Sequence, residues 1–218
     1  MALSKVDVES GGTGLIAAGT SGNVLTSDGT NWTSAAAGGG AWNLISSAVA
    51  SNSSSITVTG ISATYTTYAI VLSDIVSSVD ANNIYMRVGD ASSMKTSLYN
   101  WKTTNLRNNN TSSTYNTSTG DDDGGMQIRG EETVGSNSGE GFGGAIIYLH
   151  NARSSISYPS FSGMGTYVDI NTITTCFHFA GGYRAVLTGL DRIQIMFAGN
   201  NQYNITSGRM SLYGIAHV

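Results

Sequence analysis

Short runs of β-branched and aromatic residues recur from residue 42 to the end of the chain, and they constrain its fold more than any other feature. Three of them, Trp42–Ala50, Ser55–Gly60 and Thr67–Ile75, are separated by Ser, Asn and Gly at roughly the 8 to 12 residue spacing typical of all-β domains. Further runs of this kind are Asn83–Gly89, Lys95–Trp101, Met126–Gly130, Gly143–Asn151, Phe161–Ile170, Thr174–Arg184, Leu190–Gly199 and Gly208–Val218. The sequence therefore predicts roughly ten or eleven antiparallel strands in two packed sheets, a jelly-roll-like β-sandwich without helices.

The polarity of the chain comes from uncharged side chains. Charged residues make up 11% of the sequence, against about 25% in ordinary soluble domains. A net charge of -4 with only ten Lys and Arg argues against binding nucleic acid, which needs a basic surface. No run approaches the roughly 20 apolar residues that cross a bilayer, so no membrane insertion is expected. The start of the chain lacks the apolar core of a signal peptide, which favours folding in the cytoplasm where it is made.

The first 40 residues differ from the rest, because a few large apolar side chains lie among glycines between Gly11 and Gly40. A piece of about 40 residues rarely buries enough surface to fold alone, so we expect it to dock on sister chains or on a larger assembly. The predicted attachment residues are Gly12, Gly14, Leu15, Ile16, Val24, Leu25 and Trp32. Gly38, Gly39 and Gly40 form a predicted hinge. The expected domains are thus an attachment segment, 1–40, and a β-sandwich, 41–218.

The residues GGTGL and GTSGNVLTSDGTNWTSA within this segment are similar to a run near the N-termini of tail-fibre and other appendage proteins of tailed bacteriophages. More loosely, the closing LYGI, Leu212–Ile215, and the strand pattern resemble the C-terminal sandwich domains of such proteins. The resemblance implies a homotrimer on the virion exterior, held by other virion proteins through residues 1–40. Its distal domain would bind a host surface glycan or envelope protein. A capsid fibre or decoration protein fits the same sequence, which leaves that alternative open.

The sequence between Lys102 and Gly125 breaks the strand rhythm and predicts a long loop, with one short strand near Ser112–Thr117. Rigid aromatic side chains among amides and carboxylates are typical of binding surfaces and suit a sugar. The candidate receptor-binding residues are Tyr99, Trp101, Arg107, Asn109, Tyr115, Asp121, Asp122 and Asp123. A core position for Tyr99 and Trp101 is the alternative. The glycine-rich stretch Gly130–Gly144 is a weaker candidate.

Catalytic and cofactor chemistry find little support, and we expect no enzyme activity, no cofactor and no metal site. Asp121–Asp123 lack the every-second-residue spacing of a calcium loop. A polysaccharide depolymerase would need two carboxylates on rigid strands, whereas the Asp121–Asp123 carboxylates lie in glycine-rich sequence. The run Gly12-x-Gly14-x-x-Ala17 lacks the flanking strand and helix of a dinucleotide site.

The remaining polar and sulfur-containing residues are expected to be structural. We expect Cys176 to be a small core hydrophobe, and His150, His178 and His217 to be structural histidines at strand edges. In the run Asp191–Phe197, period-two alternation places Ile193, Ile195 and Phe197 in the core, with Arg192, Gln194 and Met196 facing away.

Overall fold

The computed structural model describes residues 23–27, 30, 32–36, 40–108, 113–128, 133–197 and 202–216, with the backbone alone at 23–27, 32–36, 108, 113–114 and 122–123. The chain divides into two compact units, Met1–Gly40 and Ala41–Val218. Every regular element in the described ranges is a strand, so none of these residues forms a helix that could cross a membrane.

The first unit contains an antiparallel hairpin that the sequence did not predict. Strand β1, Asn23–Ser27, pairs with β2, Trp32–Ala36, from Asn23 opposite Ala36 to Ser27 opposite Trp32. Among the predicted attachment residues, Val24, Leu25 and Trp32 belong to these strands. Gly12, Gly14, Leu15, Ile16, Gly38 and Gly39 lie outside the described residues, whereas the hinge residue Gly40 is described and exposed.

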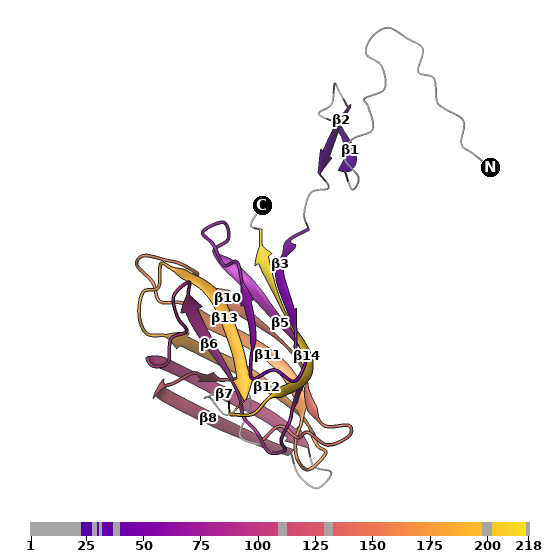
Figure 1. The fold of residues 1–218 in the computed structure, drawn as a ribbon, viewed down its shortest axis with the longest axis vertical. Helices are drawn as coiled ribbons and strands as arrows, with labels where there is room; N and C mark the ends of the chain where they lie inside the picture. The colour runs from indigo at the N-terminus through magenta and orange to yellow at the C-terminus, as the bar shows by residue number, and fades with distance from the viewer. Residues whose placement is uncertain are drawn as a thin grey trace, which may run out of the picture. The chain divides into compact units, whose positions relative to one another are not determined.

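The second unit is an all-β sandwich of two antiparallel sheets, as the sequence predicts (Figure 1). The larger sheet has eight strands in the order β3-β14-β5-β10-β11-β12-β7-β8, and the smaller has four in the order β4-β13-β6-β9. The large sheet contains β3 Trp42–Val49, β14 Ile205–Ile215, β5 Thr67–Ser77, β10 Gly141–His150, β11 Ser160–Val168, β12 Thr174–Tyr183, β7 Tyr99–Asn108 and β8 Ser113–Asp123. The small sheet contains β4 Ile56–Thr59, β13 Leu190–Phe197, β6 Ile84–Asp90 and β9 Met126–Gln127.

The core lies between the sheets and uses one face of each strand, because successive side chains of a strand point to opposite faces. In β10, Ala145, Ile147 and Leu149 are buried, while the intervening Ile146 is exposed. The small sheet contributes alternate apolar residues such as Val58 and Ile193 to the same cluster. One face of the large sheet is therefore core, and the opposite face, here called the outer face, is turned away from the small sheet.

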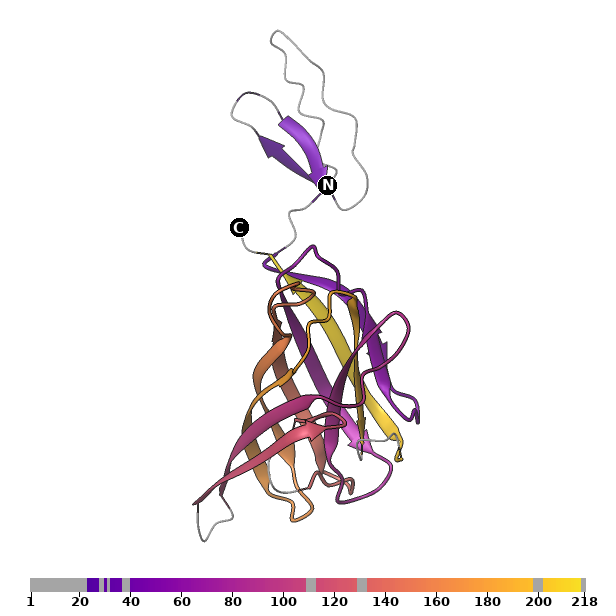
Figure 2. The same cartoon turned by 90° about the vertical axis from the view of Figure 1, so that its left-hand side faces the viewer.

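The strand pairings follow a nested pattern. The chain pairs β3 with β14, β4 with β13, β5 with β10 and β6 with β9, so early strands meet late strands in reverse order. Two hairpins are added to this framework. Strands β11 and β12 follow β10, while β7 and β8 lie between β6 and β9 in the chain, and together they widen the large sheet on one side. Figure 2 shows the β7–β8 hairpin, coloured magenta to pink, at that side of the sandwich.

The predicted long loop from Lys102 to Gly125 is wrong, because β7 and β8 occupy most of it as a regular hairpin. The core-facing positions of β7 include Thr103 and Asn105, both buried, in place of apolar residues. Polar residues on the buried side remove the hydrophobic alternation by which a strand is recognised. Backbone pairing of β7 with both β12 and β8 nevertheless makes it a strand inside the sheet.

Two burial predictions are also wrong. Met196, expected to face away from the core, is fully buried together with Ile195 and Phe197, so both faces of β13 are covered at its C-terminal end. Cys176, expected in the core, is exposed, because the buried residues of β12 are its neighbours Thr175 and Phe177. The predicted core positions of Ile193, Ile195 and Phe197 are confirmed.

Candidate functional site

Tyr99 and Trp101 are core residues, so they are not available to a receptor in this structure. Both side chains are buried, Tyr99 completely. The Val88 N–H donates to the Tyr99 hydroxyl over 2.9 Å, and this hydroxyl donates to the Lys95 carbonyl over 3.0 Å. Burial raises the pKa of the Tyr99 phenol well above its ordinary range. Tyr99 therefore ties β7 of the large sheet to β6 of the small sheet, and the core alternative for these two aromatics is the one observed.

Arg107 is held by a buried carboxylate that the sequence analysis did not single out. Its Nε donates to Oδ2 of Asp169 over 2.8 Å, and Asp169 is completely buried. The second oxygen of Asp169 accepts the backbone N–H groups of Asn171 and Ile173 at 2.8 and 3.1 Å. The run Asp169-Ile170-Asn171-Thr172 contains turn-forming residues, and this signal was present in the sequence. The pair therefore fixes the turn between β11 and β12, and we assign Arg107 a structural role.

Tyr115 and Asp121 are the predicted receptor-binding residues whose side chains the structure places at the surface. Tyr115 is 66% exposed, and Asp121 forms an exposed ion pair with Arg184 at 3.3 Å. Asp122 and Asp123 are the last two residues of β8, and the structure describes only their backbone. Asn109 lies outside the described residues. Within the described ranges, no group of three His, Cys, Asp or Glu side chains is arranged to hold a metal ion.

The outward side chains of β7 and β8 form a polar strip, here called the β7–β8 margin. Strand β8 is the last strand of the sheet order, so this strip lies at the edge of the outer face. It combines two exposed apolar side chains, Leu106 and Tyr115, which lie opposite each other in the pairing register. Along the same outward face, the two strands expose amide, ammonium, hydroxyl and carboxylate groups from Asn100, Lys102, Thr117, Thr119 and Asp121. The margin therefore offers a small apolar platform followed along the strands by a row of hydrogen-bonding groups.

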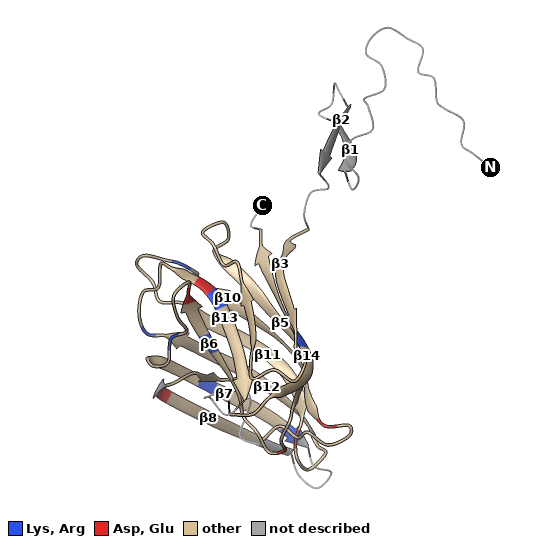
Figure 3. Ribbon diagram, in the orientation of Figure 1, with Lys and Arg blue, Asp and Glu red and all other residues tan. Residues whose placement is uncertain are grey.

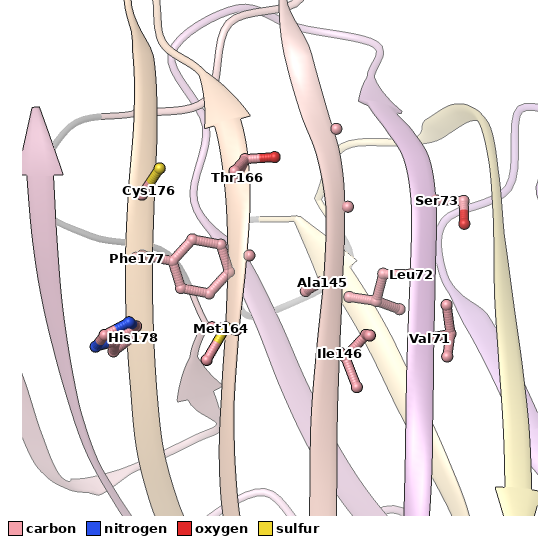
Figure 4. A pocket seen from close by; sticks show the side chains of 13 residues that line it. Val71, Leu72, Ser73, Ala145, Ile146, Met164, Thr166, Cys176, Phe177 and His178 are labelled. Atoms are coloured by element: carbon pink, nitrogen blue, oxygen red, sulfur yellow. The ribbon is translucent and has the colours of Figure 1, made fainter. Parts of the chain in front are cut away.

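A shallow hollow of about 630 Å³ lies on the outer face over β5, β10, β11 and β12 (Figure 4). Ile146, Met164 and His178 are direct neighbours across three paired strands, and Val71 extends the row onto β5. Gly143 and Gly144 line the hollow without side chains, which leaves a trough beside Met164. A second hollow of about 360 Å³ shares Ile146, Met164 and His178 and adds Tyr148 and Ser162. We call the outward surface of these four strands the central face.

The central face is apolar and nearly free of charge. Met164 is 61% exposed and Ile146 is 40% exposed, although they lie near the middle of the sheet. Strands β10, β11 and β12 contain no Asp, Glu, Lys or Arg. Figure 3 shows the large sheet mostly in tan, with charged residues mainly near strand ends and loops. An exposed sheet face is normally polar, so this composition marks the central face as a candidate interaction surface.

Two of the histidines predicted to be structural lie on the outer face. His178 is exposed and lines both hollows, while His150 is partly buried, with Nε2 lying 3.1 Å from the Ser162 hydroxyl. The ring of His150 also stacks near Tyr148, whose own ring meets Trp42 edge-on at 6.1 Å between centroids. His217 lies outside the described residues.

Sequence reasoning missed the central face because glycine interrupts the core-facing row of β11. Phe161 and Tyr167 are buried at the two ends of this row, Gly163 and Gly165 lie between them, and Met164 points outward. A Cβ atom at Gly163 would lie 2.5 Å from the carbonyl oxygen of Ile146 on the next strand, so the close packing there requires glycine. The signal available in the sequence was the run SGMG, in which glycines alternate around a single large apolar residue.

Comparisons with models of protein families, with curated proteins and with solved structures found no match for this chain.

Proposed function

We propose that this protein is a non-enzymatic structural component of a bacteriophage virion, a short homotrimeric tail fibre whose sandwich domain binds the host cell surface. The observation that carries the proposal is the N-terminal run similar to phage appendage proteins, which falls within the separate unit Met1–Gly40. The hairpin of that unit supplies a module for docking on other virion proteins. The sandwich is then the part that meets the host.

The proposed fold of the distal domain is a jelly roll enlarged by two hairpins. Without β7, β8, β11 and β12, two four-stranded sheets remain, in the orders β3-β14-β5-β10 and β4-β13-β6-β9. The four nested strand pairs are those of one long antiparallel hairpin that has been rolled into two sheets. Jelly rolls are used by viral capsid proteins and lectins, both of which present a stable exterior surface. This topology supports the proposed role but does not single out one biological function.

The β7–β8 margin is the proposed receptor-binding surface. A sugar presents apolar C–H patches and many hydroxyl groups, so it needs an exposed ring beside hydrogen-bonding groups. The margin provides the ring of Tyr115 next to Leu106, with Thr117, Thr119 and Asp121 on the same outward face of β8. Its position at the sheet edge leaves room for an extended glycan. We therefore propose a surface polysaccharide as the receptor, with an envelope protein as the alternative.

The mechanism would be avidity. A single margin is small and would bind a repeating glycan weakly. Three linked copies raise the effective concentration of the second and third contacts, and overall binding can then exceed single-site affinity by about 10² to 10⁴. Spontaneous release would require all copies to let go together, so the particle would stay on the cell surface.

Labelling of intact particles with antibodies against the sandwich domain tests the location. Label at the tail supports a tail fibre, label over the head indicates a capsid fibre or decoration protein, and unlabelled particles contradict a virion role. Incubation with purified host polysaccharide tests the non-enzymatic assignment, since released oligosaccharides would contradict it.

Binding of the purified trimer to host cells tests the margin. Replacing Tyr115 with Ala should reduce cell binding by about fivefold or more, since aromatic anchors often contribute more than about 1 kcal/mol. Tyr158→Ala is the matched control, because Tyr158 is 54% exposed in the β10–β11 connection, away from the margin. Equal binding by both variants would remove the margin from the proposal.

A further inference from the structure

The central face has the composition of a protein interface at a place where a solvated sheet should be polar. The row Val71, Ile146, Met164 and His178 crosses four adjacent strands in register, and all but the partly buried Val71 are exposed. Contiguous apolar patches of this kind are rare on monomeric soluble proteins and mark interaction sites. Scattered exposed apolar residues need no explanation, but three apolar side chains next to each other at the centre of a sheet, with Ile146 and Met164 exposed, do.

The chemistry of the face disfavours a glycan as its main occupant. The walls of the larger hollow are aliphatic, and its side-chain hydrogen-bonding groups are few, chiefly Ser73, Thr166 and His178. A sugar buried there would leave many hydroxyl groups without partners, which costs free energy for each one. An apolar protein surface loses nothing comparable, because the face contains no charge that must be desolvated between β10 and β12.

The size of the face fits association between folded chains. The four strands of the face, at about 4.8 Å each, give a width of roughly 19 Å. The 9 residues of β11 span about 30 Å along the strands. The resulting area of roughly 570 Å² on each copy gives about 1,100 Å² for two copies, which is above the approximately 1,000 Å² expected of a biological interface.

The face is also complementary to itself, because it carries both a ridge and a trough. Met164 and Ile146 protrude, while Gly143 and Gly144 leave an adjacent strip of the sheet without side chains. A ridge of one copy can enter the trough of another, as apolar residues do between the stacked sheets of a sandwich. We infer that the central face is the surface on which copies of this chain pack against each other. The inference rests on the proposed oligomeric appendage and adds the surface that would hold it together.

Cys176 provides a reporter for this contact in the natural sequence. It is exposed on the outward face of β12, opposite Thr166 of β11, and lines the larger hollow. If copies pack through the central face, the full-length protein should protect this thiol from a small water-soluble maleimide. Met164→Glu places a charge in the interface and should raise the labelling rate by about tenfold or more, since reactivity follows thiol access.

The experiment uses the full chain and measures the labelling rate and the mass by light scattering together. Ile156→Glu is the matched control, because Ile156 is 88% exposed in the β10–β11 connection and its substitution should leave the rate unchanged. Met164→Leu keeps the apolar ridge and should retain protection. Circular dichroism checks that each variant is folded. We expect the fold to tolerate substitution of Met164, because this side chain is already at the surface.

Two results would overturn the inference in distinguishable ways. A mass near three chains with a freely reactive Cys176 would keep the oligomer and reject the central face as its interface. A mass of one chain at high concentration would reject the oligomeric part of the proposed function as well. If host polysaccharide protects Cys176 in such a monomer, the face is a glycan site and not a contact between copies.

Discussion

The central face and the β7–β8 margin belong to one continuous sheet and to one set of backbone hydrogen bonds, yet they differ in chemistry. The central strands β10 to β12 contain no charged residue, and their exposed side chains include Ile146 and Met164. The margin exposes Lys102 and Asp121 among Thr and Asn side chains. A sheet fixes where side chains point but leaves their chemistry free on the exposed side. One scaffold can therefore carry a contact between copies next to a surface for a polar ligand.

The Arg107–Asp169 ion pair joins β7 of the margin to the turn between β11 and β12 of the central strands. Its removal tests how strongly the margin is held to the rest of the sheet. Asp169→Ala leaves the partly buried Arg107 without this carboxylate and frees the N–H groups of Asn171 and Ile173. We expect a loss of about 3–5 kcal/mol in the free energy of unfolding, measured by urea denaturation. Asp191→Ala is the control, because its pair with Arg192 is partly exposed and should be worth about 0–1 kcal/mol.

Hydrogen exchange would show where the loss falls. After Asp169→Ala, the exchange rates of the amides in β7, β8 and the β11–β12 turn should increase more than those of the amides in β5 and β10. Uniform acceleration over the whole sheet would mean that the two regions are a single cooperative unit, and the distinction between them would then be chemical only.

The second prediction concerns the glycines that interrupt the core-facing row of β11 behind the central face. Gly163→Ala puts a Cβ atom 2.5 Å from the Ile146 carbonyl oxygen and 2.8 Å from the Cα of Ile147. Overpacking of this kind should cost about 1–3 kcal/mol in thermal or urea unfolding. Gly143→Ala is the control, since its Cβ would meet Thr166 at 3.4 Å or more, and should change stability by less than about 0.5 kcal/mol. Equal tolerance of both would show that glycine is not required in β11.

The third prediction tests the other end of β7, where Tyr99 joins the two sheets. Tyr99→Phe removes the hydroxyl that bonds Val88 and Lys95 and should cost about 1–3 kcal/mol. Because the folded-state pKa of Tyr99 is raised above the unfolded value of about 10, its contribution is complete below pH 10 and is lost as the pH rises beyond it. The variant should therefore show a shallower alkaline loss of stability. The same alkaline slope in both proteins would exclude Tyr99 as its source.

The strands covered by the small sheet could be predicted from the sequence because burial on one face imposes apolar alternation, as in Ile193 and Ile195. That signal fails in the second half of β7, where buried Thr103 and Asn105 replace apolar residues. The strand β11 was predicted, but Gly163 and Gly165 interrupt its core-facing row, and the outward Met164 was not singled out. The candidate receptor residues were chosen by type alone. Whether an aromatic ring points inward, as in Tyr99, or outward, as in Tyr115, depends on register, which local sequence does not specify.

The smallest expected effect is on the acid dependence of the free energy of unfolding. It distinguishes the two regions because they differ in their content of carboxylates. Asp90 is the last residue of β6, and its carboxylate accepts hydrogen bonds from Lys95, Ser92 and Ser93 in the connection toward β7. These bonds, with Lys95 first, hold the pKa of Asp90 well below its ordinary range. A lowered pKa contributes stability above the unfolded value of about 3.9, and this contribution is lost as the pH falls below it.

Asp90→Asn should therefore lower stability slightly at neutral pH and flatten the acid dependence of unfolding between about pH 5 and 2, and both effects should be small because the pair with Lys95 lies near the surface and is screened. Unfolding monitored by tryptophan fluorescence at several pH values measures the slope. Asp74→Asn is the control, because Asp74 is an exposed carboxylate in β5, which β10, β11 and β12 separate from β7 in the strand order. Strands β10, β11 and β12 have no carboxylate to protonate, so exchange of their amides should respond to acid last. Acid opening of the central strands before β7 would contradict this order and show that the charge-free face is the weaker part of the sheet.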